Sequence, residues 1–250
     1  MPPRLRRFLG ATVGLLPVRV RSGAARGARW TLFPWTSYWR GTHEPRLQEA
    51  ISRLNGGDVT GWSCWDLGAH FGLYSVALAR AVGPTGQVAA FEPNPASFRR
   101  LERHRRMNGL TWLRTFPAAV SDRAGASELL TYGELDSTST HLAYEGEARG
   151  AAAAPIAIRL VQLDDLVRRG EVRAPRFIKV DVEGHGHMAV AGMRDTLAAS
   201  RPRLIVAFHS PEEVAGVLAV LRPLGYRWDP IGAFAAGSEP EIGGDYLFTP

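Results

Sequence analysis

The sequence predicts one α/β domain built on a mostly parallel sheet of roughly seven strands, with helices on both faces and an inserted β-hairpin. The first observation is length, since 250 residues suit one large α/β domain. The second is order, because short apolar runs alternate with stretches of helical periodicity, as in a doubly wound sheet. The third is that two of the apolar runs end in a carboxylate, at Asp66 and Glu92. The ends of these strands are therefore where we look for a ligand.

The first 29 residues differ from the rest of the chain. Residues 1–17 have a basic start and an apolar run, as a signal peptide has, but Arg19 and Arg21 follow at once. The run is also shorter than the roughly 20 residues that span a membrane. We therefore expect residues 1–29 to be a basic segment with an amphipathic helix that packs on a domain of residues 30–250. Weak contact of this helix with a membrane surface is the alternative.

An aromatic-rich segment leads into the first strand. Residues 34–45 combine large rings with helix-breaking residues, and we expect them to form a structured lid. A helix is expected over residues 46–55, because apolar side chains recur there at helical spacing before Gly56 and Gly57.

The first landmark is a glycine turn between a strand and a helix. Residues 64–67 are typical of a short buried strand, and residues 73–82 have the apolar spacing of a helix. Asp66 closes this strand, and Gly68 and Gly72 stand between the strand and the helix. This pattern lets the backbone pass close to a ligand and directs free helix-start N–H groups at it. Because Asp66 occupies the place of the first glycine in a dinucleotide fingerprint, the turn is poorly suited to a pyrophosphate.

The second landmark is Glu92, which closes the apolar run of residues 88–91. A strand-end acid at this distance from the glycine turn can accept hydrogen bonds from both hydroxyls of a ribose. Pro95 then opens a helix that stops at Asn108 and Gly109. The two landmarks together predict a nucleoside-type ligand across the ends of both strands.

The middle of the chain predicts a third strand over residues 112–120, followed by an insertion. Residues 128–132 and 156–160 have strand character and are expected to pair as the hairpin. The connection over residues 133–155 is long, and we expect it to gate the site. A helix begins at residue 163.

Another charged strand end follows at residues 176–184. Its apolar run is typical of a buried central strand and delivers Asp181 and Glu183 to the edge where Asp66 and Glu92 lie. Four carboxylates at one edge favour a cationic ligand. The remaining expected elements are a helix over residues 188–198, a strand over 203–209, a helix over 211–224, and closing strands over 225–228 and 245–248.

The composition narrows the partners and the compartment. The net charge of +6 is carried almost entirely by arginine, since Lys179 is the single lysine. No recognised nucleic-acid motif accompanies the charge, so we expect no nucleic-acid partner. The single cysteine, Cys64, excludes an internal disulfide and a cysteine metal cluster, and it fits a reducing, cytoplasmic location.

These motifs are similar to those of a known family. The glycine turn and Glu92 resemble the cofactor motif of S-adenosylmethionine-dependent methyltransferases. From residue 38 onward the chain resembles the FkbM-type methyltransferases, through the runs Asp66-Leu67-Gly68-Ala69-x-x-Gly72, Phe91-Glu92-Pro93-Asn94, Leu163-Asp164-Asp165-Leu166, Ile178-Lys179-Val180-Asp181-Val182-Glu183-Gly184, Arg201-Pro202 and Gly225-Tyr226. The resemblance implies a Rossmann-like class I methyltransferase domain, S-adenosylmethionine as cofactor, and in-line transfer of its methyl group to a hydroxyl of a sugar, lipid or polyketide-type small molecule.

The resemblance also assigns roles to residues. The cofactor-binding residues are expected to be Asp66, Gly68, Ala69, His70, Gly72, Tyr74, Glu92, Asn94, Ala119 and Asp181. The catalytic residues are expected to be Asp181, Glu183, His185 and His209. We expect Glu92 on the ribose hydroxyls and residues 68–72 against the methionine moiety. Asp181 is expected to fix cofactor and acceptor.

Histidine is the expected base, because its ordinary pKa lies near working pH. The candidates are His185, His187 and His209, and His185 is preferred since it lies just beyond the charged strand end. We expect no metal. A rival hypothesis makes Asp181, Glu183 and His209 ligands of a divalent metal that lowers the acceptor's pKa.

Two departures from the family pattern fall near the expected acceptor site. After Gly184 the family commonly continues Ala-Glu, where this chain has His185-Gly186, and a glutamate common in the later strand is replaced by Ala207. A non-catalytic protein that keeps the cofactor fold is therefore one alternative. An NAD-dependent oxidoreductase is another, disfavoured by Asp66 and by the lack of evident hydride-transfer residues.

Overall fold

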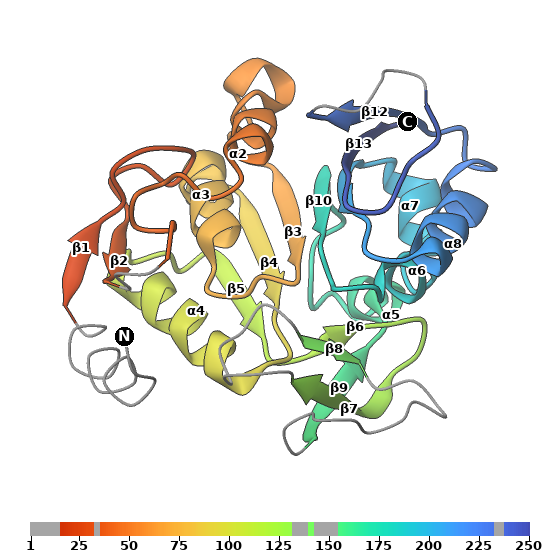
Figure 1. Ribbon diagram of the computed structural model, residues 1–250, viewed down its shortest axis with the longest axis horizontal. Helices are drawn as coiled ribbons and strands as arrows, with labels where there is room; N and C mark the ends of the chain where they lie inside the picture. The colour runs from red at the N-terminus through yellow and green to blue at the C-terminus, as the bar shows by residue number, and fades with distance from the viewer. Residues whose placement is uncertain (1–15, 33–35, 132–139, 143–154, 233–237) are drawn as a thin grey trace.

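A seven-stranded sheet organises the protein, whose computed structural model describes residues 16–32, 36–131, 140–142, 155–232 and 238–250. The strands of this sheet are β3 (Ser63–Leu67), β4 (Gln87–Phe91), β5 (Leu113–Phe116), β10 (Phe177–Val180), β11 (Arg203–Ala207), β12 (Arg227–Ile231) and β13 (Asp245–Thr249). Their order is β12-β13-β11-β10-β3-β4-β5, and β13 alone among them runs antiparallel to its neighbours (Figure 1). The predicted mostly parallel sheet is confirmed.

Helices cover both faces of the sheet. One face packs against α3 (Leu73–Val82) and α4 (Pro95–Met107), with α2 (Pro45–Ser52) at its edge, and the other against α5 (Leu163–Arg168), α6 (Gly186–Ala191), α7 (Arg194–Ser200) and α8 (Pro211–Leu221). Alternate residues of the central strand serve the two cores: Cys64 belongs to the first and Trp65 to the second, and both are fully buried. This two-sided burial is why the strands are continuous apolar runs in the sequence.

The chain reverses its direction of travel across the sheet between β3 and β10. These strands are neighbours, with Asp66 opposite Lys179, yet the chain leaves β3 toward β4 and β5 and leaves β10 toward β11. In an open α/β sheet such a switch point leaves a crevice at the carboxyl ends of the strands, where ligands bind.

Local signals set the starts of the helices beside this crevice. Gly72 is the N-cap of α3 at φ 87°, a left-handed conformation that glycine adopts without steric cost. Asn94 is the N-cap of α4, and its side chain accepts hydrogen bonds from the N–H groups of Ala96 and Ser97. Both helices begin where the sequence predicts.

The third predicted strand is wrong in its extent. Residues 112–120 divide into β5 and β6 (Ala119–Val120), which belong to different sheets. Pro117 stands at the break, where it has no N–H to donate to a strand ladder. The second sheet has the order β6-β9-β7-β8, with β7 at Gly125–Thr131, β8 at Thr140–Leu142 and β9 at Ile156–Val161. The antiparallel pair β7 and β9 is the predicted hairpin, enlarged by two strands.

The helix predicted over residues 188–198 is also wrong in its extent, because α6 and α7 divide near Gly192. A Cβ on Gly192 would lie 2.0 Å from the Ser121 carbonyl oxygen, so the chain passes Ser121 too closely for a side chain. The carboxylate of Asp164 then accepts hydrogen bonds from the N–H groups of Asp195 and Thr196, which starts α7 as a separate helix.

The N-terminal region is partly described. The amphipathic helix predicted within residues 1–17 falls almost wholly on residues 1–15, which lie outside the described residues. After them, β1 (Pro17–Arg19) pairs antiparallel with β2 (Arg29–Thr31), and Val20, Ala25 and Ala28 are buried in the core. The boundary predicted between residues 29 and 30 thus falls inside β2.

Two further expectations concern segments of special character. The loop predicted to gate the site, residues 133–155, lies outside the described residues except for β8 and residue 155. Among the helices that are described, none has the length and apolar character needed to cross a membrane.

Candidate active site

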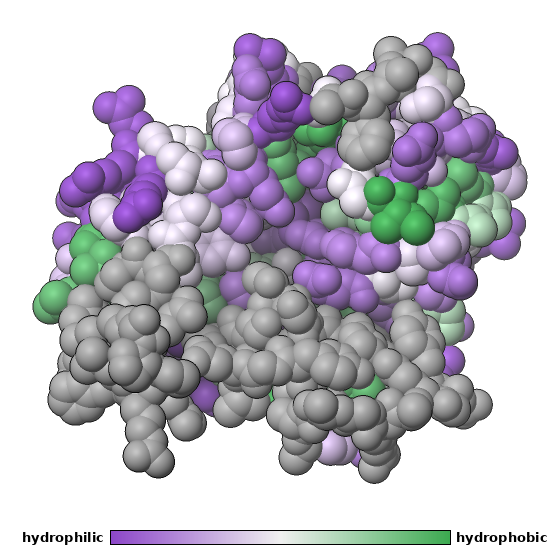
Figure 2. Space-filling view, viewed as in Figure 1, coloured by the Kyte–Doolittle hydropathy of each residue, from purple (hydrophilic) through white to green (hydrophobic). Residues whose placement is uncertain are grey.

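A cavity of about 260 Å³ lies at the carboxyl ends of the central strands. Its lining includes Tyr38, His43, Glu44, Gly68, His70, Glu92, Ser97, Ala119, Asp181, Glu183, His185 and His209. A smaller cavity of about 40 Å³ adjoins it and shares Gly68, His70 and Asp181. The face shown in Figure 2 is hollowed between the α2 side and the C-terminal side of the molecule, and hydrophilic residues gather around this hollow.

The glycine turn passes so close to the next strand end that a side chain is excluded. Gly68 has φ 79°, and a Cβ on it would lie 1.7 Å from the carbonyl oxygen of Asp181. The N–H groups of Gly68 and Ala69 donate to the carbonyl oxygen of Phe91, at 3.1 and 3.0 Å. The turn is therefore tied to the ends of both neighbouring strands.

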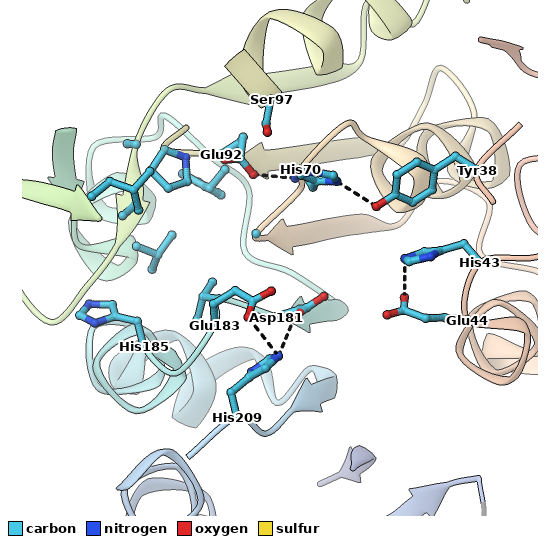
Figure 3. A pocket seen from close by; sticks show the side chains of 18 residues that line it. Tyr38, His43, Glu44, His70, Glu92, Ser97, Asp181, Glu183, His185 and His209 are labelled. Carbon is cyan, nitrogen blue, oxygen red and sulfur yellow. Dashed lines mark hydrogen bonds and ion pairs between the residues drawn. The ribbon is translucent and has the colours of Figure 1, made fainter. Parts of the chain in front are cut away.

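Glu92 is fixed by two backbone N–H groups. Its Oε2 accepts from His70 at 2.6 Å and its Oε1 from Asn94 at 2.8 Å, which holds the carboxylate at the cavity wall (Figure 3). Burial raises the pKa of Glu92 to about 7, against the lowering effect of these two bonds. Above Glu92, the Ser97 hydroxyl lines the cavity, is 1 % exposed and has no hydrogen-bond partner among the described residues.

Lys179 links two of the strand-end acids from within the sheet. Its Nζ lies 3.0 Å from Asp181 Oδ2 and 3.7 Å from Asp66 Oδ1, and its side chain is 2 % exposed. Burial alone would lower the pKa of Lys179, but the two carboxylates raise it above its usual value. In turn, the burial that would raise the pKa of Asp181 is outweighed by Lys179 and His209, which lower it. Ser75 Oγ donates to the other oxygen of Asp66 at 2.5 Å.

His209 lies among three carboxylates. Its Nε2 is 3.5 Å from Asp181 Oδ1 and 3.9 Å from Glu183 Oε2, and its Nδ1 is 3.4 Å from Glu213 Oε2 (Figure 3). Burial would lower the pKa of His209, but the hydrogen bond to Glu213 and the charges of Asp181 and Glu183 raise it to about 9. In this environment His209 is a cation at neutral pH.

Glu213 of α8 reaches under two strand-end turns. It is fully buried; its Oε1 accepts from the Gly186 N–H at 2.7 Å and its Oε2 from the His209 N–H at 2.7 Å. A Cβ on Gly186 would lie 2.4 Å from Glu213 Oε1, so glycine at this position is what admits the carboxylate. The Gly186 departure noted in the sequence thus has a structural counterpart in Glu213.

The remaining histidines of this side differ in position. His185 lines the larger cavity, and its Nε2 lies 3.2 Å from Ser121 Oγ. Burial and the neighbouring His187 lower the pKa of His185 to about 4, so its ring is neutral at pH 7. His187 packs against Gly216 of α8.

Residues 36–44, which precede α2, close the cavity on the side opposite His185 (Figure 3). The Tyr38 hydroxyl lies 2.9 Å from His70 Nδ1, and His70 stacks on Phe71 with ring centroids 3.7 Å apart. Burial raises the pKa of Tyr38. Tyr74 Oη donates to Glu44 Oε2 at 2.7 Å, which links α3 to this segment. The expectation that residues 34–45 cover the site agrees with these contacts for residues 36–45.

The Methyltransferase FkbM domain model matches residues 66–228, which is more than half of the chain. The chain belongs to the FkbM methyltransferase family. It is 28 % identical over 233 residues to the hexuronic acid methyltransferase AglP of Haloferax volcanii, covering 86 % of each protein. S-adenosylmethionine is accordingly the cofactor, and the protein is a methyltransferase.

Solved structures agree with the fold. The methyltransferase FkbM of Methylobacillus flagellatus is 17 % identical, with a TM-score of 0.52 over 79 % of this chain and 47 % of that one. This chain therefore spans about half the length of that relative. A putative rRNA-methylase from Clostridium thermocellum is 9 % identical, with a TM-score of 0.51 over 83 % of this chain and 96 % of that one.

The structure gathers the predicted FkbM site residues at one place. Five predicted cofactor-binding residues line the larger cavity, namely Gly68, His70, Glu92, Ala119 and Asp181. Ala69 and Tyr74 line the smaller cavity. The other three, Asp66, Gly72 and Asn94, are buried and hold the walls in place. All four predicted catalytic residues, Asp181, Glu183, His185 and His209, line the larger cavity.

Sequence reasoning missed Lys179 and Glu213 as parts of the site. Lys179 carried a signal, because a lone lysine inside an apolar strand must find a partner when buried. Glu213 carried none, since it looks like an ordinary acid in the first turn of a helix.

Proposed function

We propose that this FkbM-family enzyme transfers a methyl group to a hydroxyl oxygen of a small molecule, with a sugar as the first acceptor class to test. The observation that carries the proposal is a single cavity with two unlike walls. One wall holds the glycine turn and Glu92, and the other holds Asp181, Glu183, His185 and His209. A cofactor on the first wall would present its reactive end to an acceptor on the second.

The first wall fits S-adenosylmethionine. Glu92 is held with both carboxylate oxygens at the cavity, where a ribose diol would find acceptors, and the buried Ser97 hydroxyl offers one further hydrogen bond. Gly68 and Asp181 pack directly against each other and both line the cavity, at the place where the methionine moiety would lie. When bound, the cofactor supplies a methyl group already activated by its sulfonium.

The second wall would orient the acceptor and receive its proton. Holding the acceptor oxygen in line with the methyl group can by itself remove about 7–11 kcal/mol from a barrier. As the oxygen–carbon bond forms, the sulfur–carbon bond breaks and the hydroxyl proton leaves. His185 is the histidine of this wall that lies apart from the three carboxylates around His209, so we assign it the proton-accepting role.

The wall chemistry bears on the acceptor class. Among the described residues that line the larger cavity there is no arginine or lysine, while Glu44, Glu92, Asp181 and Glu183 are all acidic. Hydroxyl groups can donate to such carboxylates, whereas a bare anion would be repelled. The hydroxyls of a sugar fit this acidic wall, and AglP is named for a sugar acid, so a sugar is the first acceptor class to test.

Product analysis tests this proposal. The full chain is incubated with methyl-¹³C-labelled S-adenosylmethionine and either neutral methyl glycosides, hexuronates, or lipid and polyketide alcohols. We expect a ¹³C methyl ether in the NMR spectrum of at least one sugar. Asp181→Asn should abolish its formation, while Asp195→Asn, at an exposed carboxylate on α7, should not. A methyl ester or an N-methyl product would overturn the hydroxyl assignment.

A further inference from the structure

The residues around His209 form a set of metal-ligand donors as well as a charge cluster. Asp181 and Glu183 follow the end of β10, and His209 follows the end of β11. One donor atom from each lies within 4.8 Å of the other two. The fold brings the ends of these two strands together, because β10 and β11 are paired neighbours in the sheet. We propose that Asp181, Glu183 and His209 bind one divalent first-row cation such as Mn²⁺.

The separations between the donor atoms suit a shared ion better than direct contact. His209 Nε2 lies 3.5 Å from Asp181 Oδ1 and 3.9 Å from Glu183 Oε2, beyond ordinary hydrogen-bond length. Ligands that bind one ion at about 2.1 Å lie roughly 3.0–3.4 Å from one another in tetrahedral or octahedral geometry. Small side-chain adjustments would therefore close the three donors around an ion. Two carboxylate oxygens and one imidazole nitrogen are donors that Mn²⁺ and its neighbours accept.

An independent feature is the carboxylate behind the histidine. Metal-binding histidines commonly donate their second ring N–H to a carboxylate, which fixes the tautomer and the ring orientation. Glu213 supplies this carboxylate: it is fully buried, and its Oε2 lies 3.4 Å from His209 Nδ1 and accepts the His209 backbone N–H. With one proton held on Nδ1, an ion that displaces the Nε2 proton would meet the Nε2 lone pair facing Asp181 and Glu183.

The other neighbours leave room for the ion. Lys179 contacts Asp181 through Oδ2, on the opposite side of the carboxylate from Oδ1, and so fixes its orientation. All three proposed ligands line the larger cavity, so the remaining coordination positions would face an acceptor. Three protein donors leave such positions open, as catalytic metal sites do.

The cation would give the acidic wall a way to hold an acceptor. It would bind a hydroxyl pair, or a hydroxyl and a carboxylate, and lower the pKa of the hydroxyl that is methylated. This catalytic role rests on the proposed function, whereas the binding of the ion does not. A sugar acid, which the four wall carboxylates would otherwise repel, would then bind through its own carboxylate to the ion.

The test measures metal binding directly. Full-length protein is freed of metal with a chelator and titrated with Mn²⁺, and loss of the free-ion EPR signal reports binding. We expect one saturable equivalent per chain, abolished in His209→Ala. Glu213→Gln should weaken binding about 10–100-fold, as loss of such a supporting carboxylate does. Glu212→Gln, which alters an exposed neighbour on the same helix, should leave binding unchanged.

Two readouts keep this proposal separate from the proposed function. Cofactor calorimetry on each variant checks that the fold and the first wall are intact, so a lost Mn²⁺ signal is not a folding defect. Equal Mn²⁺ binding by the wild type and His209→Ala would overturn the metal site. Full methylation of a hydroxyl by protein freed of metal would overturn the catalytic role of the ion while supporting the proposed function. One bound Mn²⁺ in a protein that methylates no hydroxyl would support the site and contradict the function.

Discussion

The two walls of the cavity are built in different ways. On the cofactor wall, Glu92 is held by the N–H groups of His70 and Asn94, which lie in the turns that follow β3 and β4. On the acceptor wall, His209 and Gly186 are joined by Glu213, which comes from the buried side of α8. The first wall is thus formed by two short sequence motifs, whereas the second depends on how α8 packs against the sheet.

The largest expected effect comes from the residue where the walls meet. Gly68→Ala would place a Cβ 1.7 Å from the Asp181 carbonyl oxygen at a φ of 79°, so both the turn and the β10 end would have to move. We expect a loss of unfolding free energy of roughly 4 kcal/mol or more and no measurable cofactor binding. Denaturant unfolding and calorimetry measure the two effects.

A matched glycine provides the control for this substitution. Gly83 has a similar φ of 67°, but a Cβ there would meet nothing within 4 Å. Gly83→Ala should therefore cost only the backbone strain, about 1–3 kcal/mol. If both variants lose the same stability, the close approach of the walls at Gly68 is not what the glycine provides.

The next effect separates the walls. Glu92→Ala removes both acceptors for the ribose hydroxyls, and hydrogen bonds to a charged group contribute about 1.5–3 kcal/mol each, so we expect at least ~100-fold weaker cofactor binding. The acceptor wall should be unaffected, with Mn²⁺ titration as in the wild type. Unchanged calorimetric affinity for S-adenosylhomocysteine would contradict the role of Glu92.

The same contrast explains which features of the protein could be predicted from its sequence. The glycine turn, Glu92 and the starts of α3 and α4 were predictable, because each depends on residues a few positions apart. Two breaks were not predicted, namely the division of residues 112–120 at Pro117 and the separation of α6 from α7 at Gly192. The break at Gly192 depends on the Ser121 carbonyl oxygen, which is distant in the sequence. Asp66 was predicted to bind the cofactor, and this stays a prediction. Its contacts with Ser75 and Lys179 could not be predicted, because Lys179 becomes its neighbour only through the order of the strands.

The acceptor wall can be disturbed alone through Gly186. A Cβ at this position would lie 2.4 Å from Glu213 Oε1 and push the carboxylate from beneath His209. For Gly186→Ala we expect methyl transfer to fall about 10–100-fold, the range seen when supporting contacts of a site residue are lost. Cofactor affinity should stay within about twofold, because no contact of the first wall changes. A loss of cofactor affinity equal to the loss of turnover would show that the walls are not independent.

The smallest expected effect is the dependence of cofactor binding on pH, which returns to Glu92. Burial raises the pKa of Glu92 to about 7, so the carboxylate that two ribose hydroxyls require is largely protonated at pH 6 and ionised at pH 8. Binding is therefore strongest above this pKa and weakens as pH falls through it, by roughly tenfold between pH 8 and pH 6. Methylthioadenosine is the suitable probe, because it has the ribose but no amino group that titrates in this range. Glu92→Gln has no charge to lose, so its weaker affinity should be flat across the same interval. A wild-type profile as flat as that of Glu92→Gln would mean that the ribose is held by another group of this wall.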